Sequence, residues 1–234
     1  MHTWVLDPPA IPRLPVDGSS QGFAVNRVFC LGRNYPWPGD DPSASRQRPL
    51  YFMKPASCVV TAWGEVPYPG ATEEFCPEIE LVVALAKGGR DIPESRALEH
   101  VWGYGAGLDL TRRDLQKAAK AQGQSWEAAK AFDGAAPITA LVPVSQIGHP
   151  DQGALWLRVN GQERQRSDLS LQLWSVAEVI SLLSRYLTLQ PGDLIMTGTP
   201  AGVEPLQPGD VIHAAVEGIA SLEMTVGPHQ ETPR

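Results

Sequence analysis

The sequence is poor in cysteine and has no long apolar run. Its 234 residues include three cysteines, Cys30, Cys58 and Cys76, and no two of them form a CxxC pair. An odd number without such pairs argues against a disulfide framework and a structural zinc site. No apolar run approaches the roughly 20 residues that cross a bilayer, and residues 1–15 lack the segments of a signal peptide. We therefore expect a cytoplasmic protein without a membrane partner.

Clusters of basic residues are also absent. Lys and Arg number 19 against 26 Asp and Glu, which gives a net charge of -7. Nucleic acids and anionic membranes select for clustered Lys and Arg, so neither is expected as a partner. A small anionic substrate remains compatible, because a few local cations can hold one inside an acidic protein.

Prolines mark the boundaries of the expected parts. A chain of this length commonly forms one domain, and we assign it to residues 27–226. Residues 1–26 are proline-rich and predict an N-terminal arm laid on that domain, and residues 227–234 form a short tail. Residues 36–49 hold four prolines, which exclude a regular element and predict a functional lid or a disordered loop. These prolines are Pro36, Pro38, Pro42 and Pro49.

Strand-like segments outnumber helical ones and do not alternate with them as βαβ units. This pattern favours an α+β fold built on a curled mixed sheet. Strands are expected within residues 27–35, 49–55, 58–69, 78–86, 102–111, 154–159, 162–166, 194–198 and 211–217. Helices are expected over residues 91–101, 112–132 with a break near Gly123, and 175–187.

Short local patterns set several element ends. Asp91 with Glu94, and Ser175 with Glu178, have the spacing of a helix capping box. The dipeptide Asn160-Gly161 predicts a β-hairpin. The motif QPGD occurs twice, each time before a strand, and its Pro-Gly pair fits a type II turn.

Two acidic residues share one face of the most strand-like segment, residues 78–86. Glu78 and Glu80 are two residues apart, so both side chains point to one side, with Ile79 on the other. Nearby carboxylates repel each other unless a cation lies between them. Asp109 stands in a second apolar strand, where a bare charge is costly to bury. Three oxygen ligands without His or Cys favour Mg²⁺, Mn²⁺ or Ca²⁺ over Zn²⁺.

A second interpretation of these acids needs no metal. Glu78 and Glu80 would face solvent, and Asp109 would pair with Arg112 or Arg113. Strands with two carboxylates are common, so the spacing alone leaves both interpretations open.

Six ordered blocks carry a resemblance to a known family. They read GRNY (32–35), PEIELVVAL (77–85), GYGAGLDLTRRDLQ (103–116), SWEAAKAFDGAAP (125–137), VNG (159–161) and PGDLIMTGTPAGV (191–203). In order and spacing they resemble the fumarylacetoacetate-hydrolase family, most closely its acylpyruvase and fumarylpyruvate-hydrolase branch. The resemblance covers nearly the whole chain.

The resemblance implies a mixed β-sandwich roll with a few peripheral helices, assembled as a homodimer. It implies Mg²⁺ or Mn²⁺ on an E-x-E…D triad, which Glu78, Glu80 and Asp109 match. The implied reaction cleaves a carbon–carbon bond in a β-diketo acid of aromatic catabolism, or decarboxylates or isomerises a related keto acid. The substrate is then a small anionic 2-oxo acid.

The resemblance also implies roles for residues outside the triad. Lys130 matches the lysine of the W-x-x-x-K-x-F-D block, and Gln116 matches the glutamine of RDLQ, both as catalytic residues. A developing enolate would be stabilised by the metal and by Lys130. In the family, residues of GRNY border the pocket and the second threonine of TGTP meets the substrate carboxylate. The implied substrate-binding residues are Arg33, Tyr35, Arg113 and Thr199.

One part of the family pattern is missing. Hydrolytic members follow GRNY with a lid histidine three residues after the tyrosine and an acid three further on, and this pair activates water. Here Pro38 and Asp41 stand at these positions, and no histidine occurs between residues 3 and 99. Asp40, Asp41 and Glu74 are candidate replacements, but a carboxylate with a pKa of about 4 is a weaker base than imidazole.

Three functions are therefore compatible with the sequence. The first is a metal-dependent hydrolase of an acylpyruvate such as fumarylpyruvate. The second is a decarboxylase, isomerase or tautomerase of a 2-oxo acid, which needs no activated water. The third is a weakly active relative that mainly binds its ligand.

Overall fold

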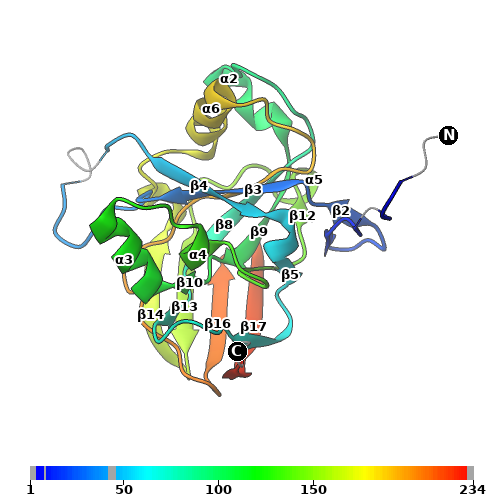
Figure 1. The fold of residues 1–234 in the computed structure, drawn as a ribbon. Coiled ribbons are helices and arrows are strands. Elements are labelled where there is room, and N and C mark those ends of the chain that lie inside the picture. The colour runs from blue at the N-terminus through cyan, green and yellow to red at the C-terminus, as the bar shows by residue number, and fades with distance from the viewer. Residues whose placement is uncertain (1–3, 8, 42–45, 231–234) are drawn as a thin grey trace.

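The computed structural model describes residues 4–7, 9–41 and 46–230, and two packed β-sheets dominate them (Figure 1). The larger sheet is mixed and has eight strands. They are β3 (Arg27–Gly32), β4 (Leu50–Pro55), β5 (Val59–Thr61), β8 (Ile79–Leu85), β9 (Val101–Leu108), β11 (Ala136–Ile138), β12 (Val142–Pro143) and β15 (Leu194–Met196). Their spatial order is β4-β3-β15-β8-β9-β11-β5, with β12 paired to β9.

The second sheet has five strands and covers one face of the first. They are β6 (Gly64–Tyr68), β13 (Ala154–Val159), β14 (Gln162–Asp168), β16 (Val211–Val216) and β17 (Ala220–His229). Their order is β14-β13-β16-β17-β6, and they form the lower part of the molecule in Figure 1. The two remaining strand pairs are β1 (Arg13–Pro15) with β2 (Gly22–Ala24), and β7 (Phe75–Cys76) with β10 (Thr111–Arg112).

The helices are short and lie at the periphery of the sheets. They are α2 (Glu94–Ala97), α3 (Arg113–Gln122), α4 (Glu127–Lys130), α5 (Val144–Ile147) and α6 (Val176–Tyr186), with 3₁₀ turns η1 (Ala56–Cys58), η2 (Leu98–His100) and η3 (Leu169–Leu171). In Figure 1, α2 and α6 cap one end of the molecule, and α3 and α4 flank one side. This arrangement confirms the predicted α+β fold, a mixed β-sandwich roll with few helices.

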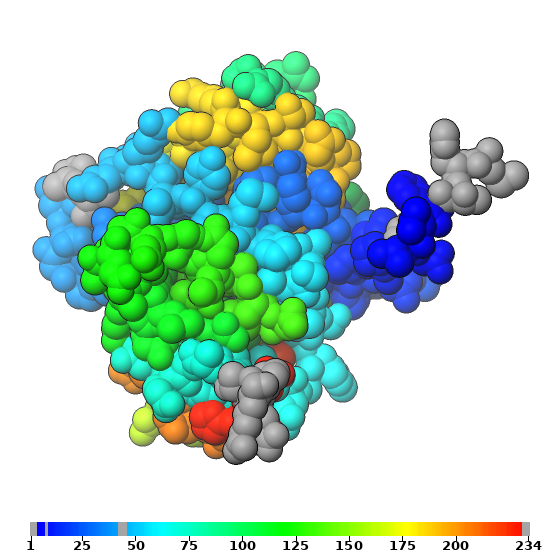
Figure 2. Space-filling model, viewed as in Figure 1, coloured from blue at the N-terminus to red at the C-terminus, as the bar shows by residue number. Residues whose placement is uncertain are grey.

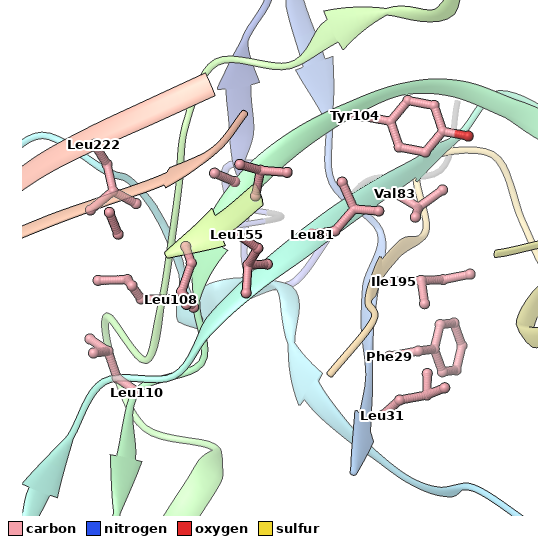
Figure 3. Close-up of a cluster of buried hydrophobic side chains, with 14 of the residues drawn as sticks. Phe29, Leu31, Leu81, Val83, Tyr104, Leu108, Leu110, Leu155, Ile195 and Leu222 are labelled. Atoms are coloured by element: carbon pink, nitrogen blue, oxygen red, sulfur yellow. The ribbon is translucent and has the colours of Figure 1, made fainter. Parts of the chain in front are cut away.

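Strand β8 is buried on both faces, which explains its unbroken run of apolar residues. Ile79, Leu81 and Val83 belong to the core that both sheets share, whereas Val82 and Ala84 belong to a separate cluster on the opposite face. Figure 3 shows the shared core, whose labelled side chains include Leu81, Leu108, Leu155 and Leu222. The sheet that carries the acidic residues is therefore a covered middle layer.

Most local turn and cap predictions are confirmed. Asn160 and Gly161, with φ of 50° and 78°, join β13 to β14. Ser175 and Glu178 form the expected reciprocal capping box of α6. Gly123, with φ of 64°, ends α3, and the two QPGD turns precede β15 and β16.

The predicted capping box at Asp91 is wrong. Asp91 has a left-handed backbone with φ of 51°, and α2 begins at Glu94 without a side-chain cap. The Asp91 N–H instead donates to the Ser184 carbonyl oxygen, so helix α6 fixes this segment. The four-residue helix α5 was not predicted, because so short a segment carries no usable periodicity.

The described part of the N-terminal segment contains the β1–β2 hairpin. Leu14 is fully buried in the second cluster, whereas Trp4 and Leu6 are exposed. Residues 4–7 lead away from the body in Figure 1. Residues 36–41 and 46–49 contain no helix or strand. Pro42 of the expected lid and residues 231–234 of the tail lie outside the described residues. No described helix is long and apolar enough to cross a membrane.

Candidate metal centre and active site

Antiparallel pairing of β8 with β9 brings three carboxylates together. Glu80 lies opposite Gly107, and the Asp109 N–H donates to the Glu78 carbonyl oxygen at 2.8 Å. Asp109 therefore lies opposite Glu78, one residue beyond the end of β9, and cross-strand neighbours share a face of the sheet. Because Glu80 follows Glu78 by two residues, all three side chains point to one side.

The three carboxylates are buried and close enough to share one cation. Each offers an oxygen within 4.8 Å of the other two, and none of the residues is more than 6% exposed. The solvent-facing alternative is therefore wrong. Arg113 pairs with Glu78 (Nη1 to Oε1, 3.2 Å), and no arginine in the described part of the chain pairs with Asp109.

Lys130 lies against the triad and is fixed by three acceptors. Its ammonium donates to Glu78 Oε2 and Asp109 Oδ2, both at 2.7 Å, and to Thr111 Oγ1 at 2.6 Å. Burial alone would lower the pKa of Lys130, but Asp109 and Glu78 outweigh it and raise that pKa above its usual range. Lys130 is therefore a permanent cation beside the carboxylates.

Lys54 is a second buried cation, and sequence reasoning missed it. Its Nζ lies 2.8 Å from Asp109 Oδ1, without exposed surface, and donates to the carbonyl oxygens of Leu110 and Lys130. Burial raises the pKa of Asp109, but Lys130 and Lys54 outweigh it and lower that pKa. A lysine in a strand usually faces solvent, so nothing local in the sequence identified Lys54.

The donor set fits a divalent cation. Burial, and then Asp109 and Glu78, raise the pKa of Glu80 well above normal. No lysine in the described part of the chain pairs with Glu80 to offset this rise. Glu80 Oε2 accepts one bond, from the Gly198 N–H at 2.7 Å. Asp109 Oδ1 is buried and forms no hydrogen bond of normal geometry, although Lys54 lies within ion-pair distance. Carboxylate oxygens alone suit Mg²⁺, Mn²⁺ or Ca²⁺.

The cluster adjoins a cavity of about 1000 Å³. Its walls come from the end of β3 and the following loop, from α3 and α4, and from the TGTP loop after β15. The loop (blue) and α3 (green) lie side by side in Figure 2. The predicted site residues that line the cavity are Arg33, Tyr35, Glu78, Arg113, Gln116, Lys130 and Thr199.

Two of the predicted pocket residues, Gln116 and Tyr35, keep groups that can bind a ligand. Arg113 Nη1 donates to Gln116 Oε1 at 2.8 Å, which fixes the amide and leaves its nitrogen bonded to no described residue. The Tyr35 hydroxyl accepts a bond from Gln172 Nε2 at 3.2 Å. Burial raises the pKa of Tyr35, so its phenol stays neutral and can donate to an oxygen in the cavity.

The hydroxyl of Thr199 is already engaged. It donates to the Ile79 carbonyl oxygen at 2.8 Å and accepts from Gln165 Nε2 at 2.9 Å. Gln165, buried on β14, also accepts from the Ile79 N–H and donates to the Pro200 carbonyl oxygen. A substrate carboxylate could accept a hydrogen bond from the Thr199 hydroxyl only if the hydrogen bond from that hydroxyl to the Ile79 carbonyl oxygen broke. Sequence reasoning also missed Gln165.

Arg33 has a left-handed backbone with φ of 61°. This conformation costs roughly 1–2 kcal/mol in a residue other than glycine, and the buried Asn34 holds it. The Asn34 amide donates to the carbonyl oxygens of Trp174 and Thr197 and accepts from the Trp174 N–H. The constrained turn fixes where the Arg33 side chain leaves the backbone, at the cavity wall.

The expected lid contributes Trp37, Asp40 and Asp41 to the cavity lining. The Trp37 N–H donates to Asp40 Oδ2 at 3.2 Å, and the Asp40 N–H donates to the Trp37 carbonyl oxygen at 2.9 Å. Trp37 is 54% exposed. Pro38, at the position of the family's lid histidine, offers no group that exchanges a proton.

Comparison with known proteins identifies the fold and its site with a family. The sequence profile described as "Fumarylacetoacetate (FAA) hydrolase C-terminal" matches residues 27–227. The chain is an enzyme of the fumarylacetoacetate hydrolase family. Fumarylpyruvate hydrolase of Ralstonia sp is 43% identical over 184 residues, which cover 79% of this chain and 95% of the relative. Oxaloacetate tautomerase FAHD1 of Homo sapiens is 37% identical over 200 residues, covering 85% and 90%.

A solved structure of this fumarylacetoacetate hydrolase family has nearly the same fold. The crystal structure of fumarylpyruvate hydrolase from Pseudomonas aeruginosa, in complex with Mn²⁺ and pyruvate, aligns with a TM-score of 0.92 and 46% identity. The alignment covers 97% of this chain and 100% of that chain. The resemblance found in the sequence is therefore confirmed for both family and fold.

Replacing a carboxylate of the triad should weaken metal binding. Glu78→Gln, Glu80→Gln and Asp109→Asn each exchange an anionic ligand for a neutral amide, so affinity for Mn²⁺ should fall more than about tenfold. Calorimetric titration measures this change. The matched control is Glu74→Gln, a partly exposed acid paired with Lys117, which should keep the wild-type affinity. Unchanged affinity in all three variants would refute the site.

Removing the second lysine should destabilise the metal-free protein. Lys54→Met leaves the buried Asp109 with one cation fewer, which should cost about 3–5 kcal/mol of unfolding free energy. Denaturant titration with and without Mn²⁺ measures the loss and its partial recovery by the metal. Lys117→Met, at an exposed position, should stay within about 0.5 kcal/mol of wild type. Equal stability of Lys54→Met and wild type without metal would contradict this role.

Proposed function

We propose that this enzyme is a divalent-metal-dependent hydrolase that cleaves a carbon–carbon bond in an acylpyruvate, with fumarylpyruvate as the leading example. The observation that carries the proposal is the buried triad of Glu78, Glu80 and Asp109 beside Lys130, at a cavity lined by cations. Relatives named fumarylpyruvate hydrolase, one of them solved with Mn²⁺ and pyruvate, support it. Mn²⁺ or Mg²⁺ is the proposed cofactor, and Ca²⁺ is a third candidate.

The reaction adds water to the ketone of the acyl group. It breaks the bond between that carbonyl carbon and the methylene of the pyruvate part. The products are a carboxylic acid and the enolate of pyruvate, which takes up a proton. When bound, the cation supplies a Lewis acid for the oxygens of the 2-oxo acid. Lys130 stabilises the negative charge that develops as the bond breaks. Gln116 and Tyr35 donate hydrogen bonds that orient the substrate.

The missing lid histidine supports a second candidate function. A positioned general base contributes about 10²–10⁴-fold in rate, and Pro38 supplies none. Tautomerisation, isomerisation or decarboxylation of a 2-oxo acid needs no activated water, and relatives named oxaloacetate tautomerase share up to 38% identity with this chain. For hydrolysis, Asp40 and Asp41 are the lid carboxylates at the cavity.

The proposed organisation of the chain follows the same likeness. Residues 27–226 form the catalytic domain, residues 1–26 the arm and residues 227–234 the tail, and the profile match over residues 27–227 supports this division. Assembly as a homodimer and a place in aromatic catabolism are proposals from family likeness, and a cytoplasmic location is a proposal from the sequence pattern.

Product analysis separates the two candidate functions. With Mn²⁺ bound, fumarylpyruvate should yield fumarate and pyruvate in equal amounts, observed by NMR. The same protein stripped of metal by a chelator is the control and should yield neither. Faster conversion of enol-oxaloacetate to its keto form, with fumarylpyruvate left intact, would instead establish the tautomerase.

Restoring the lid pair should raise hydrolysis. Pro38→His with Asp41→Glu supplies a base, so kcat for an acylpyruvate should rise by up to about 10²–10⁴-fold. The double variant should also gain a limb near pH ~6.5 in its rate profile, absent from wild type. Pro38→Ala relaxes the backbone without adding a base and is the control. A fast wild type that is inactivated by Asp40→Ala with Asp41→Ala would show that a lid carboxylate already serves as the base.

A further inference from the structure

The outer wall of the cavity carries cations that the proposed chemistry does not use. Five Lys and Arg side chains line the cavity against three Asp and Glu. Lys130 and Arg113 are bonded to Glu78. Arg33 and Lys120, in contrast, form no ion pair within the described ranges of the chain. Arg33 and Lys120 therefore bring positive charge to this wall that no ion pair with a described residue offsets.

Helix α3 arranges part of this charge in a row. Arg113, Gln116 and Lys120 follow at intervals of three and four residues, so they share one face of the helix. Arg113, at the start of the row, is bonded to the triad residue Glu78. With a helical rise of about 1.5 Å per residue, Lys120 lies roughly 10 Å farther along the axis than Arg113. The row thus leads from the metal centre to the outer cavity.

Lys120 occupies a defined place at the end of this row. Its ammonium lies 4.7 Å from the ring centroid of Trp126, which also lines the cavity. Partial burial, and then Arg113 and Arg33, lower the pKa of Lys120. Arg113 and Arg33 therefore both repel Lys120, and an anion bound beside Lys120 and Arg33 would relieve that repulsion.

Arg33 reaches the cavity from the turn after β3, where its strained backbone is held by the buried Asn34. Strain of this kind persists where the surrounding structure enforces it, and it concentrates at functional sites. We propose that Arg33 and Lys120 form a subsite for a second carboxylate, at the end of the acyl group remote from the metal. The subsite would select acylpyruvates whose acyl group ends in a carboxylate over those with a neutral end.

This inference rests on the proposed function for one point, that the 2-oxo acid end of the substrate lies at the triad. Its test uses 2-oxoadipate and 2-oxohexanoate, which have the same chain length and differ in a terminal carboxylate against a methyl group. Neither is a β-diketone, so calorimetry with the Mn²⁺-loaded protein measures binding without hydrolytic cleavage. Wild type should bind 2-oxoadipate about tenfold more tightly, the effect of one charge-assisted hydrogen bond.

Variants assign that preference to the two cations. Lys120→Met should remove most of the preference and leave the affinity for 2-oxohexanoate unchanged, whereas Lys120→Arg should retain the preference. Arg33→Met should also remove most of the preference. The matched control is Lys117→Met, an exposed lysine of the same helix that is paired with Glu74. Equal affinity of wild type for the two acids, or an equal loss of both in Lys120→Met, would overturn the subsite.

Turnover of fumarylpyruvate and acetylpyruvate separates this inference from the proposed function. The Lys120→Met variant should lower kcat/KM for fumarylpyruvate about tenfold, mainly through KM, and leave acetylpyruvate unaffected. If neither compound is cleaved but Lys120 still sets the preference for 2-oxoadipate, the hydrolase proposal fails and the subsite stands. If both are cleaved at rates that Lys120→Met does not change, the subsite fails and the hydrolase stands.

Discussion

The burial of three carboxylates beside two lysines is the constraint on which the site depends. A bare charge is expensive to bury, so Glu78, Glu80 and Asp109 can be buried only with cations beside them. Lys54 comes from β4 and Lys130 from α4, and each ion pair fixes its element over the end of the β8–β9 pair. Lys54, Lys130 and Arg113 pair with Asp109 and Glu78, whereas Glu80 has no paired cation in the described part of the chain, and a divalent cation would fit there.

The same charge balance makes the proposed acidic substrate compatible with an acidic protein. The chain as a whole carries a net charge of -7, but the cavity wall has more Lys and Arg than Asp and Glu. A divalent cation on the triad would make this region more positive still. Low-dielectric walls concentrate the electric field of these cations in the cavity. An anion is therefore attracted to the cavity, although the net negative charge of the protein repels it.

Sequence reasoning reached the parts of the site that depend on local periodicity. Alternation put Glu78 and Glu80 on one face, and the apolar strand around Asp109 indicated a third ligand. The family motifs added Lys130, and the register of β8 with β9 brings the three carboxylates together. Lys54 and Gln165 were missed because each contacts the site only through residues distant in the chain. The capping-box prediction at Asp91 was wrong for the same reason, because a hydrogen bond to α6 overrides the local pattern.

The fold separates metal binding from the activation of water. The triad and its lysines stand on strands and a short helix that are packed from both sides, whereas Trp37, Asp40 and Asp41 stand on a loop without regular structure. Trp37 and Asp40 of that loop bond to each other. Pro38, at the position of the family's lid histidine, therefore leaves the buried carboxylates in place, and under the proposed function it changes only which base is available. Under the proposed function, relatives of one fold share a 2-oxo-acid site and differ in reaction, because the choice between hydrolysis and tautomerisation depends on this loop, which can vary without disturbing the buried charges.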